Sequence, residues 1–176
     1  MSQAKFNVRR VAVLGAGVMG AQIAAHLVNA SVPTVLFDLA SPTGDKSAIA
    51  KKAIAGLQKL KPAPLAARGR ADYITPANYE EHLHLLQDCD LVIEAIAERI
   101  DWKTDLYHLV APHLGAHTLF ATNTSGLSIN TLAAACPDSV RPRFCGVHFF
   151  NPPRYMHLVE IIPCVTSDAD VLDKLE

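Results

Sequence analysis

A run of apolar residues that passes directly into three closely spaced glycines constrains this chain more than any other feature. Residues 10–24 read RVAVLGAGVMGAQIA, so an apolar strand leads through a glycine-rich turn into an amphipathic helix. Gly15 permits the tight turn, Gly17 lets the backbone approach a ligand, and Gly20 allows the helix to pack closely on the strand. Because a helix beginning here presents free N–H groups and a positive dipole end, the turn is typical of a nucleotide diphosphate site.

A second strand-like run, Thr34–Asp38, ends in an acid. It follows the glycine turn by about 20 residues, where a carboxylate accepts hydrogen bonds from the hydroxyls of an adenosine ribose. The same charge would repel a 2′-phosphate, so Asp38 predicts NAD rather than NADP. The alternative is a glycine-rich turn that binds no ligand, and the joint presence of strand, turn, helix and acid argues against it.

The rest of the chain alternates between strand-like and helical patterns. Helices are expected over residues 18–29, 48–60, 79–86, 101–114 and 129–135, and strands over 10–14, 34–38, 71–75, 89–95, 118–122, 144–148 and 157–162. This alternation predicts an α/β fold, a Rossmann-like doubly wound and mostly parallel sheet with helices on both faces. Ligands of such sheets bind beyond the carboxyl ends of the strands.

Composition and charge argue against several other classes of protein. A formal net charge of -1 gives no basic surface for nucleic acid, and the eight histidines are scattered rather than spaced as metal ligands. The four cysteines include no CxxC pair, which favours a reducing compartment. No apolar stretch reaches the length of a membrane span and Met1–Arg10 lacks a signal-peptide core, so we expect a cytoplasmic protein without a membrane partner.

Two polar residues near the carboxyl end of the chain suggest acid–base chemistry. His148 ends one apolar strand and Glu160 lies within the next. If the strands are adjacent, the carboxylate fixes the imidazole tautomer and leaves the other ring nitrogen free to take a substrate proton. Spacing alone also allows a core histidine bound to a backbone carbonyl, with Glu160 on a solvated face.

Other polar residues follow the ends of two predicted strands. Residues 123–126 (NTSG) are placed to hold a nicotinamide ribose or a substrate hydroxyl, or simply to cap the following helix. Glu94, Glu98 and Lys103 follow another strand and either reach the cofactor or are exposed charges.

Four motifs in this order resemble the amino-terminal domain of 3-hydroxyacyl-CoA dehydrogenases: GAGVMG at 15–20, VIEAIAE at 92–98, NTS at 123–125 and HFFNP at 148–152. The resemblance covers almost the whole chain. It implies that His148 is the catalytic base, that Glu160 orients it, and that Ser125 hydrogen-bonds the 3-hydroxyl of the substrate. Asn151 is implied beside the histidine, on the substrate side.

The resemblance also extends the expected cofactor site beyond the glycine turn. It implies that Glu98, Lys103 and Asn123 contact the cofactor or organise the closed site. The expected NAD-binding residues are therefore Gly15, Gly17, Val18, Met19, Gly20, Asp38, Glu98, Lys103 and Asn123.

The reaction implied by the resemblance is NAD-dependent oxidation of an (S)-3-hydroxyacyl-CoA to a 3-oxoacyl-CoA, a step of fatty-acid β-oxidation. Residues 1–176 are expected to form the NAD-binding domain, with a helical substrate and dimerisation domain lying outside them. The full protein is then a homodimer, and this segment alone is monomeric and inactive. Two alternatives share the scaffold: a dehydrogenase of a non-CoA hydroxy acid, and a nucleotide-binding protein without catalysis. The polar set His148, Glu160 and Ser125 argues against the second.

Overall fold

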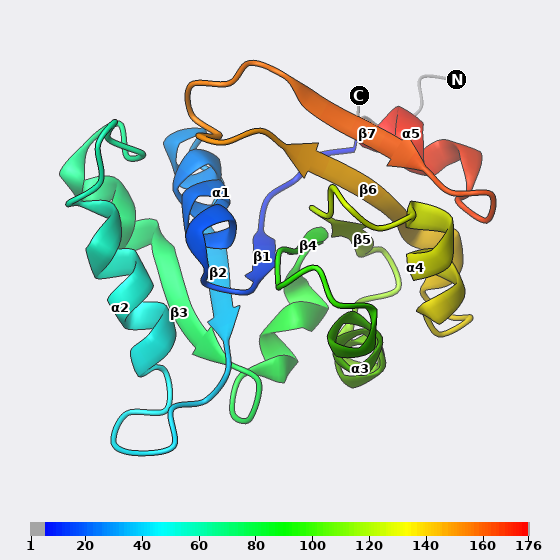
Figure 1. The fold of residues 1–176 in the computed structure, drawn as a ribbon, viewed down its shortest axis with the longest axis horizontal. Coiled ribbons are helices and arrows are strands. Elements are labelled where there is room, and N and C mark those ends of the chain that lie inside the picture. The colour runs from blue at the N-terminus through cyan, green and yellow to red at the C-terminus, as the bar shows by residue number, and fades with distance from the viewer. Residues whose placement is uncertain (1–5, 176) are drawn as a thin grey trace.

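The computed structural model describes residues 6–175, and within them lies a seven-stranded sheet with the order β3-β2-β1-β4-β5-β6-β7 (Figure 1). The strands are β1 (Val11–Leu14), β2 (Thr34–Asp38), β3 (Ile74–Asn78), β4 (Leu91–Glu94), β5 (Leu119–Thr122), β6 (Phe144–Phe149) and β7 (Val159–Pro163). Neighbouring strands are parallel up to β6, and β7 is antiparallel to β6. The predicted doubly wound, mostly parallel sheet is confirmed.

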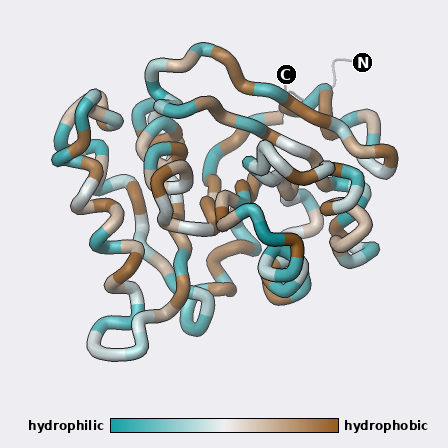
Figure 2. The backbone as a smooth tube through the Cα atoms, viewed as in Figure 1, coloured by the Kyte–Doolittle hydropathy of each residue, from teal (hydrophilic) through white to brown (hydrophobic). Residues whose placement is uncertain are grey.

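Helices cover both faces of this sheet. They are α1 (Val18–Asn29), α2 (Ala48–Leu57), α3 (Ile100–Val110), α4 (Ile129–Ala135) and α5 (Ala169–Leu175). One buried apolar cluster joins the sheet to α1, α2 and α5, and a second joins it to α3 and α4. Figure 2 shows the corresponding pattern, with hydrophobic segments along the sheet and hydrophilic ones in the outer turns. Burial of both faces explains why the central strands β1, β4 and β5 are largely apolar runs.

The structure differs from the sequence prediction on either side of β3. The strand expected over 71–75 begins only at Ile74, because the 3-10 helix η1 (Arg68–Tyr73) precedes it. The strand contains Pro76, which is tolerated because β3 lies at the edge of the sheet.

The helix expected over 79–86 is absent from the described structure. Instead, the Asn78 side-chain oxygen accepts hydrogen bonds from the amides of Glu80 and Glu81, and the 3-10 helix η2 (Leu83–Asp88) follows. This local turn competes with an α-helical start.

The four cysteines are buried and their thiols are free. Burial raises the pKa of Cys89 to about 11 and the pKa values of Cys136 and Cys145 to about 12. Within residues 6–175, no helix combines the length and apolar character needed to cross a membrane. The prediction that Met1–Arg10 holds no signal-peptide core falls partly on residues 1–5, outside the described range.

The order of the strands determines where a ligand can bind. The chain moves outward from β1 to β2 and β3, then returns to β4 on the other side of β1. At this switch point the connections after β1 and β4 lead to opposite faces of the sheet and leave a crevice beyond their carboxyl ends. The glycine turn follows β1 and residues 95–99 follow β4, so both border this crevice.

Candidate active site

The glycine turn between β1 and α1 has the shape that a bound diphosphate requires. Gly15 has a φ of +105°, and a Cβ there would lie 2.9 Å from the Ala95 carbonyl oxygen. A Cβ on Gly20 would lie 1.8 Å from the Gly15 carbonyl oxygen, whereas one on Gly17 would meet no atom within 4 Å. Gly15 and Gly20 are therefore required by packing. Gly17 leaves open space at the N-terminus of α1, where an anion can approach.

Asp38 ends β2 beside this turn, as predicted. Its Oδ2 accepts a hydrogen bond from the Ala16 amide at 2.6 Å, and its Oδ1 accepts one from the Leu39 amide at 2.7 Å. The carboxylate lines a pocket of about 570 Å³ that also includes Gly15 and Gly17. Apolar side chains from α3 form another wall of this pocket, called the cofactor pocket below: Trp102, Leu106 and Leu109. A charged acceptor beside an apolar wall suits a nucleoside, whose ribose is polar and whose base is flat.

His148 and Glu160 face each other across the last two strands of the sheet. The register of β6 and β7 pairs the two residues directly, and Nδ1 of His148 lies 2.9 Å from Oε2 of Glu160. The side chain of His148 is 18% exposed and that of Glu160 is 48% exposed. When Nδ1–H donates to the carboxylate, Nε2 keeps a free lone pair and can accept a proton.

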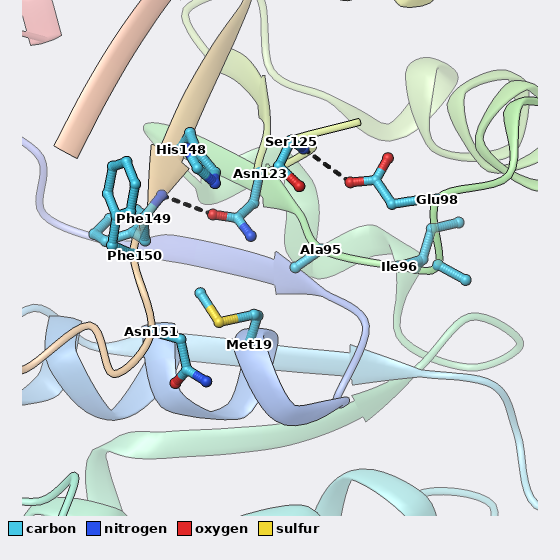
Figure 3. A pocket seen from close by; sticks show the side chains of 11 residues that line it. Met19, Ala95, Ile96, Glu98, Asn123, Ser125, His148, Phe149, Phe150 and Asn151 are labelled. Atoms are coloured by element: carbon cyan, nitrogen blue, oxygen red, sulfur yellow. Dashed lines mark hydrogen bonds between the residues drawn. The ribbon is translucent and has the colours of Figure 1, made fainter. Parts of the chain in front are cut away.

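A second pocket, of about 410 Å³, lies beside this pair and is called the reaction pocket below. Its walls include Met19, Glu98, Asn123, Ser125, His148 and Asn151. Figure 3 shows side chains from β6, from the end of β5 and from α1 gathered around it. The segment Ala95–Ala97 lines both this pocket and the cofactor pocket, so the two are neighbours.

Hydrogen bonds fix the polar residues that follow β5. The Asn123 side-chain oxygen accepts from the Phe149 amide at 2.9 Å and ties β5 to the end of β6 (Figure 3). The Glu98 carboxylate accepts from the Ser125 amide at 2.8 Å and from the Thr124 hydroxyl. Desolvation acts to raise the pKa of Glu98, but these hydrogen bonds outweigh it and leave the pKa below its usual value. An ionised Glu98 thus holds the backbone of Ser125 at the pocket wall.

Lys103 does not lie on the wall of either pocket. Its Nζ lies 2.6 Å from Oε1 of Glu94, and the two side chains are 1% and 0% exposed. The resemblance implies that Lys103 contacts the cofactor or organises the closed site; the structure holds its ammonium group in a buried ion pair with Glu94, which also accepts a hydrogen bond from the Ile96 amide. From the sequence, Glu94 could either contact the cofactor or be an exposed charge. In the structure it is buried and lines neither pocket.

The buried carboxylate of Glu94 organises the segment that separates the two pockets. It accepts hydrogen bonds from the Ile96 amide at 2.7 Å, the Thr122 hydroxyl at 2.7 Å and the Tyr107 hydroxyl at 3.0 Å. All of its acceptor capacity is used within the protein, which makes the buried charge tolerable. Sequence reasoning missed this role; the available signal was an acid at the end of an apolar strand with a lysine on the next helix.

Two further predicted residues lie at the start of α1 and after β6. Val18 is exposed at the first position of α1, and Met19 faces the reaction pocket. The Asn151 side-chain oxygen lies 3.4 Å from Nε2 of Gln22 on α1, which places Asn151 between His148 and the helix that follows the glycine turn. Across the described part of the chain, no three His, Cys, Asp or Glu side chains converge as metal ligands would.

Comparison with known proteins supports the identity suggested by these sites. Residues 10–176 match the family model described as "3-hydroxyacyl-CoA dehydrogenase, NAD binding domain". The chain is 44% identical to a putative fatty acid oxidation complex trifunctional enzyme of Rickettsia felis, over 96% of this chain and 24% of that protein. It is 39% identical to a probable 3-hydroxyacyl-CoA dehydrogenase of Deinococcus radiodurans, over 94% of this chain and 48% of that protein.

A solved structure gives the same result for the fold. The crystal structure of 3-hydroxybutyryl-CoA dehydrogenase from Escherichia coli K12 superposes with a TM-score of 0.78 at 33% identity, over 96% of this chain and 35% of that one. The chain thus spans a quarter to a half of the curated relatives named above. Its glycine turn, Asp38 and apolar wall fit NAD, and the chain belongs to the family of NAD-binding domains of 3-hydroxyacyl-CoA dehydrogenases.

Proposed function

We propose that this chain supplies the cofactor site and the catalytic base for oxidation of an (S)-3-hydroxyacyl-CoA to a 3-oxoacyl-CoA, as a step of fatty-acid β-oxidation. The observation that carries the proposal is the pairing of His148 with Glu160 beside a pocket that also contains Ser125. A histidine held by a carboxylate next to a hydroxyl donor is the arrangement needed to remove a proton from a substrate alcohol.

The residues that would hold NAD come from the ends of the first two strands. The backbone from Gly15 to Gly20 would surround the diphosphate, including the amides of Val18 and Met19 at the start of α1. Asp38 would accept hydrogen bonds from the adenosine ribose. NAD, when bound, supplies the hydride acceptor, which no side chain of a protein can provide.

His148 and its neighbours would handle the proton of the reacting hydroxyl. Nε2 of His148 accepts this proton, and the imidazolium that forms is stabilised by the charge of Glu160. The Ser125 hydroxyl hydrogen-bonds the substrate oxygen, and Asn151 lines the same pocket. Asn123 and Glu98 act by position, because their hydrogen bonds keep the ends of β5 and β6 in place. Such preorganisation lowers the barrier by fixing the reacting groups before the reaction.

Asp38→Ala is expected to weaken NAD binding to the 176-residue chain by about tenfold or more, since a hydrogen bond to a charged group contributes roughly 1.5 to 3 kcal/mol. Isothermal titration calorimetry gives the dissociation constant. Asp72→Ala, a change at an exposed acid of η1, is the matched control and should leave the affinity unchanged. An unaltered affinity in Asp38→Ala would remove Asp38 from the ribose site and with it the preference for NAD over NADP.

The 176-residue chain alone is expected to bind NAD but to turn over almost no 3-hydroxybutyryl-CoA, because we propose that a helical domain supplies the second wall of the substrate site. It should also be a monomer, whereas the complete enzyme should be a homodimer. Light scattering and an NADH absorbance assay test both points. The comparison is a fusion of this chain to the part of the Deinococcus radiodurans relative that it does not cover. A stable dimer with full turnover from the chain alone would overturn this division of roles. A fusion that oxidises only hydroxy acids without CoA would instead favour the non-CoA dehydrogenase.

A further inference from the structure

Tyr79 carries a buried polar group that nothing in the site described so far uses. It follows β3 directly, and its ring stacks on Phe37 of β2 with centroids 5.7 Å apart and planes 18° apart. Tyr79 lines the cofactor pocket together with Gly15 and Asp38. Its hydroxyl is buried, and it finds no hydrogen-bond partner among residues 6–175. Buried hydroxyls are normally paired, so this exception requires an explanation.

Two groups near this hydroxyl, the Gly15 amide and the Asp38 carboxylate, form hydrogen bonds with other atoms of the protein. The Gly15 amide donates to the Phe37 carbonyl oxygen at 2.9 Å. The two Asp38 carboxylate oxygens accept from the amides of Ala16 and Leu39. Burial, and next the charge of Asp38, raises the pKa of Tyr79 well above its usual value, so the hydroxyl keeps its proton and remains a donor.

We propose that the Tyr79 hydroxyl is a hydrogen-bonding group for the adenosine ribose of NAD, and that it acts beside the carboxylate of Asp38. The position supports this role because Asp38 ends β2, Tyr79 directly follows the neighbouring strand β3, and both residues line the same pocket as the glycine turn. The stacked ring holds the hydroxyl in place before the cofactor arrives, so the bond forms with little loss of side-chain freedom. The inference rests on the NAD site of the family and is independent of the proposed acyl-CoA substrate.

This assignment predicts opposite effects on the empty and the loaded protein. Without NAD, the unpaired hydroxyl destabilises the fold, because burial removes it from water without replacing the lost hydrogen bond. With NAD, the same hydroxyl contributes to affinity. If Tyr79 only packed the core, its substitution would change the melting temperature of the empty protein but would not weaken binding of the adenosine half of NAD more than binding of the nicotinamide half.

Tyr79→Phe tests the inference, since it removes the hydroxyl and keeps the ring on Phe37. The 176-residue variant should melt at the same temperature as the parent or higher when empty. Its dissociation constant for NAD should rise by about fivefold, as expected for one neutral hydrogen bond. The constant for ADP-ribose, which keeps the adenosine ribose and lacks nicotinamide, should rise by the same factor. Binding of nicotinamide mononucleotide, followed by ligand-observed NMR, should not change.

Tyr73→Phe is the matched control, because Tyr73 is exposed at the end of η1 and does not line the cofactor pocket. This variant should change neither the melting temperature of the empty chain nor its dissociation constant for NAD. An unchanged NAD affinity in Tyr79→Phe, with Asp38→Ala still weakening it, would overturn the inference and leave the cofactor site standing. An equal loss of affinity for nicotinamide mononucleotide and for ADP-ribose would also overturn the inference, because the effect would not be confined to the adenosine half of the site. A parent chain that binds no NAD would remove the cofactor site itself.

Discussion

His148→Gln is expected to lower turnover of 3-hydroxybutyryl-CoA by roughly 100-fold or more, the usual contribution of a positioned general base. Glutamine cannot take up the substrate proton, although it fills much of the same space. NAD affinity should stay nearly unchanged, because His148 lines the reaction pocket and not the cofactor pocket. Glu160→Gln should cause similar damage, since it keeps the shape of the side chain and removes the charge that stabilises the imidazolium. Steady-state rates of the fusion described above measure both effects.

The matched control for this pair is His157→Gln. His157 lies in the exposed loop between β6 and β7, so it tests whether any histidine near the site affects the rate. Its turnover should remain close to that of the parent. Near-normal turnover in both His148→Gln and Glu160→Gln would show that the pair is structural and that another group removes the proton.

Gly20→Ala is expected to destabilise the chain by roughly 3 kcal/mol or more, the upper range for forcing an extra methyl into a packed site. The added Cβ would lie 1.8 Å from the carbonyl oxygen of Gly15, and this atom belongs to the backbone of the turn and cannot move aside alone. For a domain of this size the melting temperature should fall by about 6 to 12 °C. Differential scanning calorimetry of the 176-residue chain measures this fall in melting temperature. NAD binding should also be lost, because the geometry of the turn changes.

Gly17→Ala separates the folding role of the turn from its binding role. Gly17 has a φ of -70° and a Cβ there meets no atom within 4 Å, so the melting temperature should not change. The NAD dissociation constant should nevertheless rise, because the methyl group would occupy the space through which the diphosphate approaches the backbone. Normal NAD affinity in Gly17→Ala would place the diphosphate elsewhere. An unchanged melting temperature in Gly20→Ala would contradict the close packing of α1 on β1.

The parts of the fold that local sequence determines could be predicted, and the glycine turn is the clearest case. Strand, turn and helix from Val11 to Asn29 form one continuous segment, and Gly15 and Gly20 each meet a steric requirement within it. The proximity of His148 and Glu160 could not be decided from spacing, because it depends on the register of β6 against β7. At the level of the sequence, only the resemblance of the motifs favours that pairing.

Other features depend on contacts between distant residues, and the sequence pattern misled there. Lys103 lies on a helix where a charge is usually exposed, but Glu94 of β4 draws it into the core. The residues from Ala71 to Thr75 have the composition of a strand, yet pairing with β2 begins only at Ile74. The helix expected after Asn78 gives way to a side-chain turn. In each case a tertiary or side-chain interaction outweighs the local conformational preference of the residues, which differs little in energy between helix, strand and turn.

The antiparallel pairing of β6 with β7 has a consequence for how enzymes of this kind can diversify. His148 and Glu160 are cross-strand neighbours, so they stay aligned as long as the backbone register of β6 against β7 is kept. The side chains of the connecting loop, residues 150–158, can therefore change while the proton-transfer pair stays aligned, provided that this register is kept. An insertion within β7 itself would turn Glu160 to the opposite face of the sheet. Substrate preference and proton chemistry can thus evolve separately, although they share one hairpin.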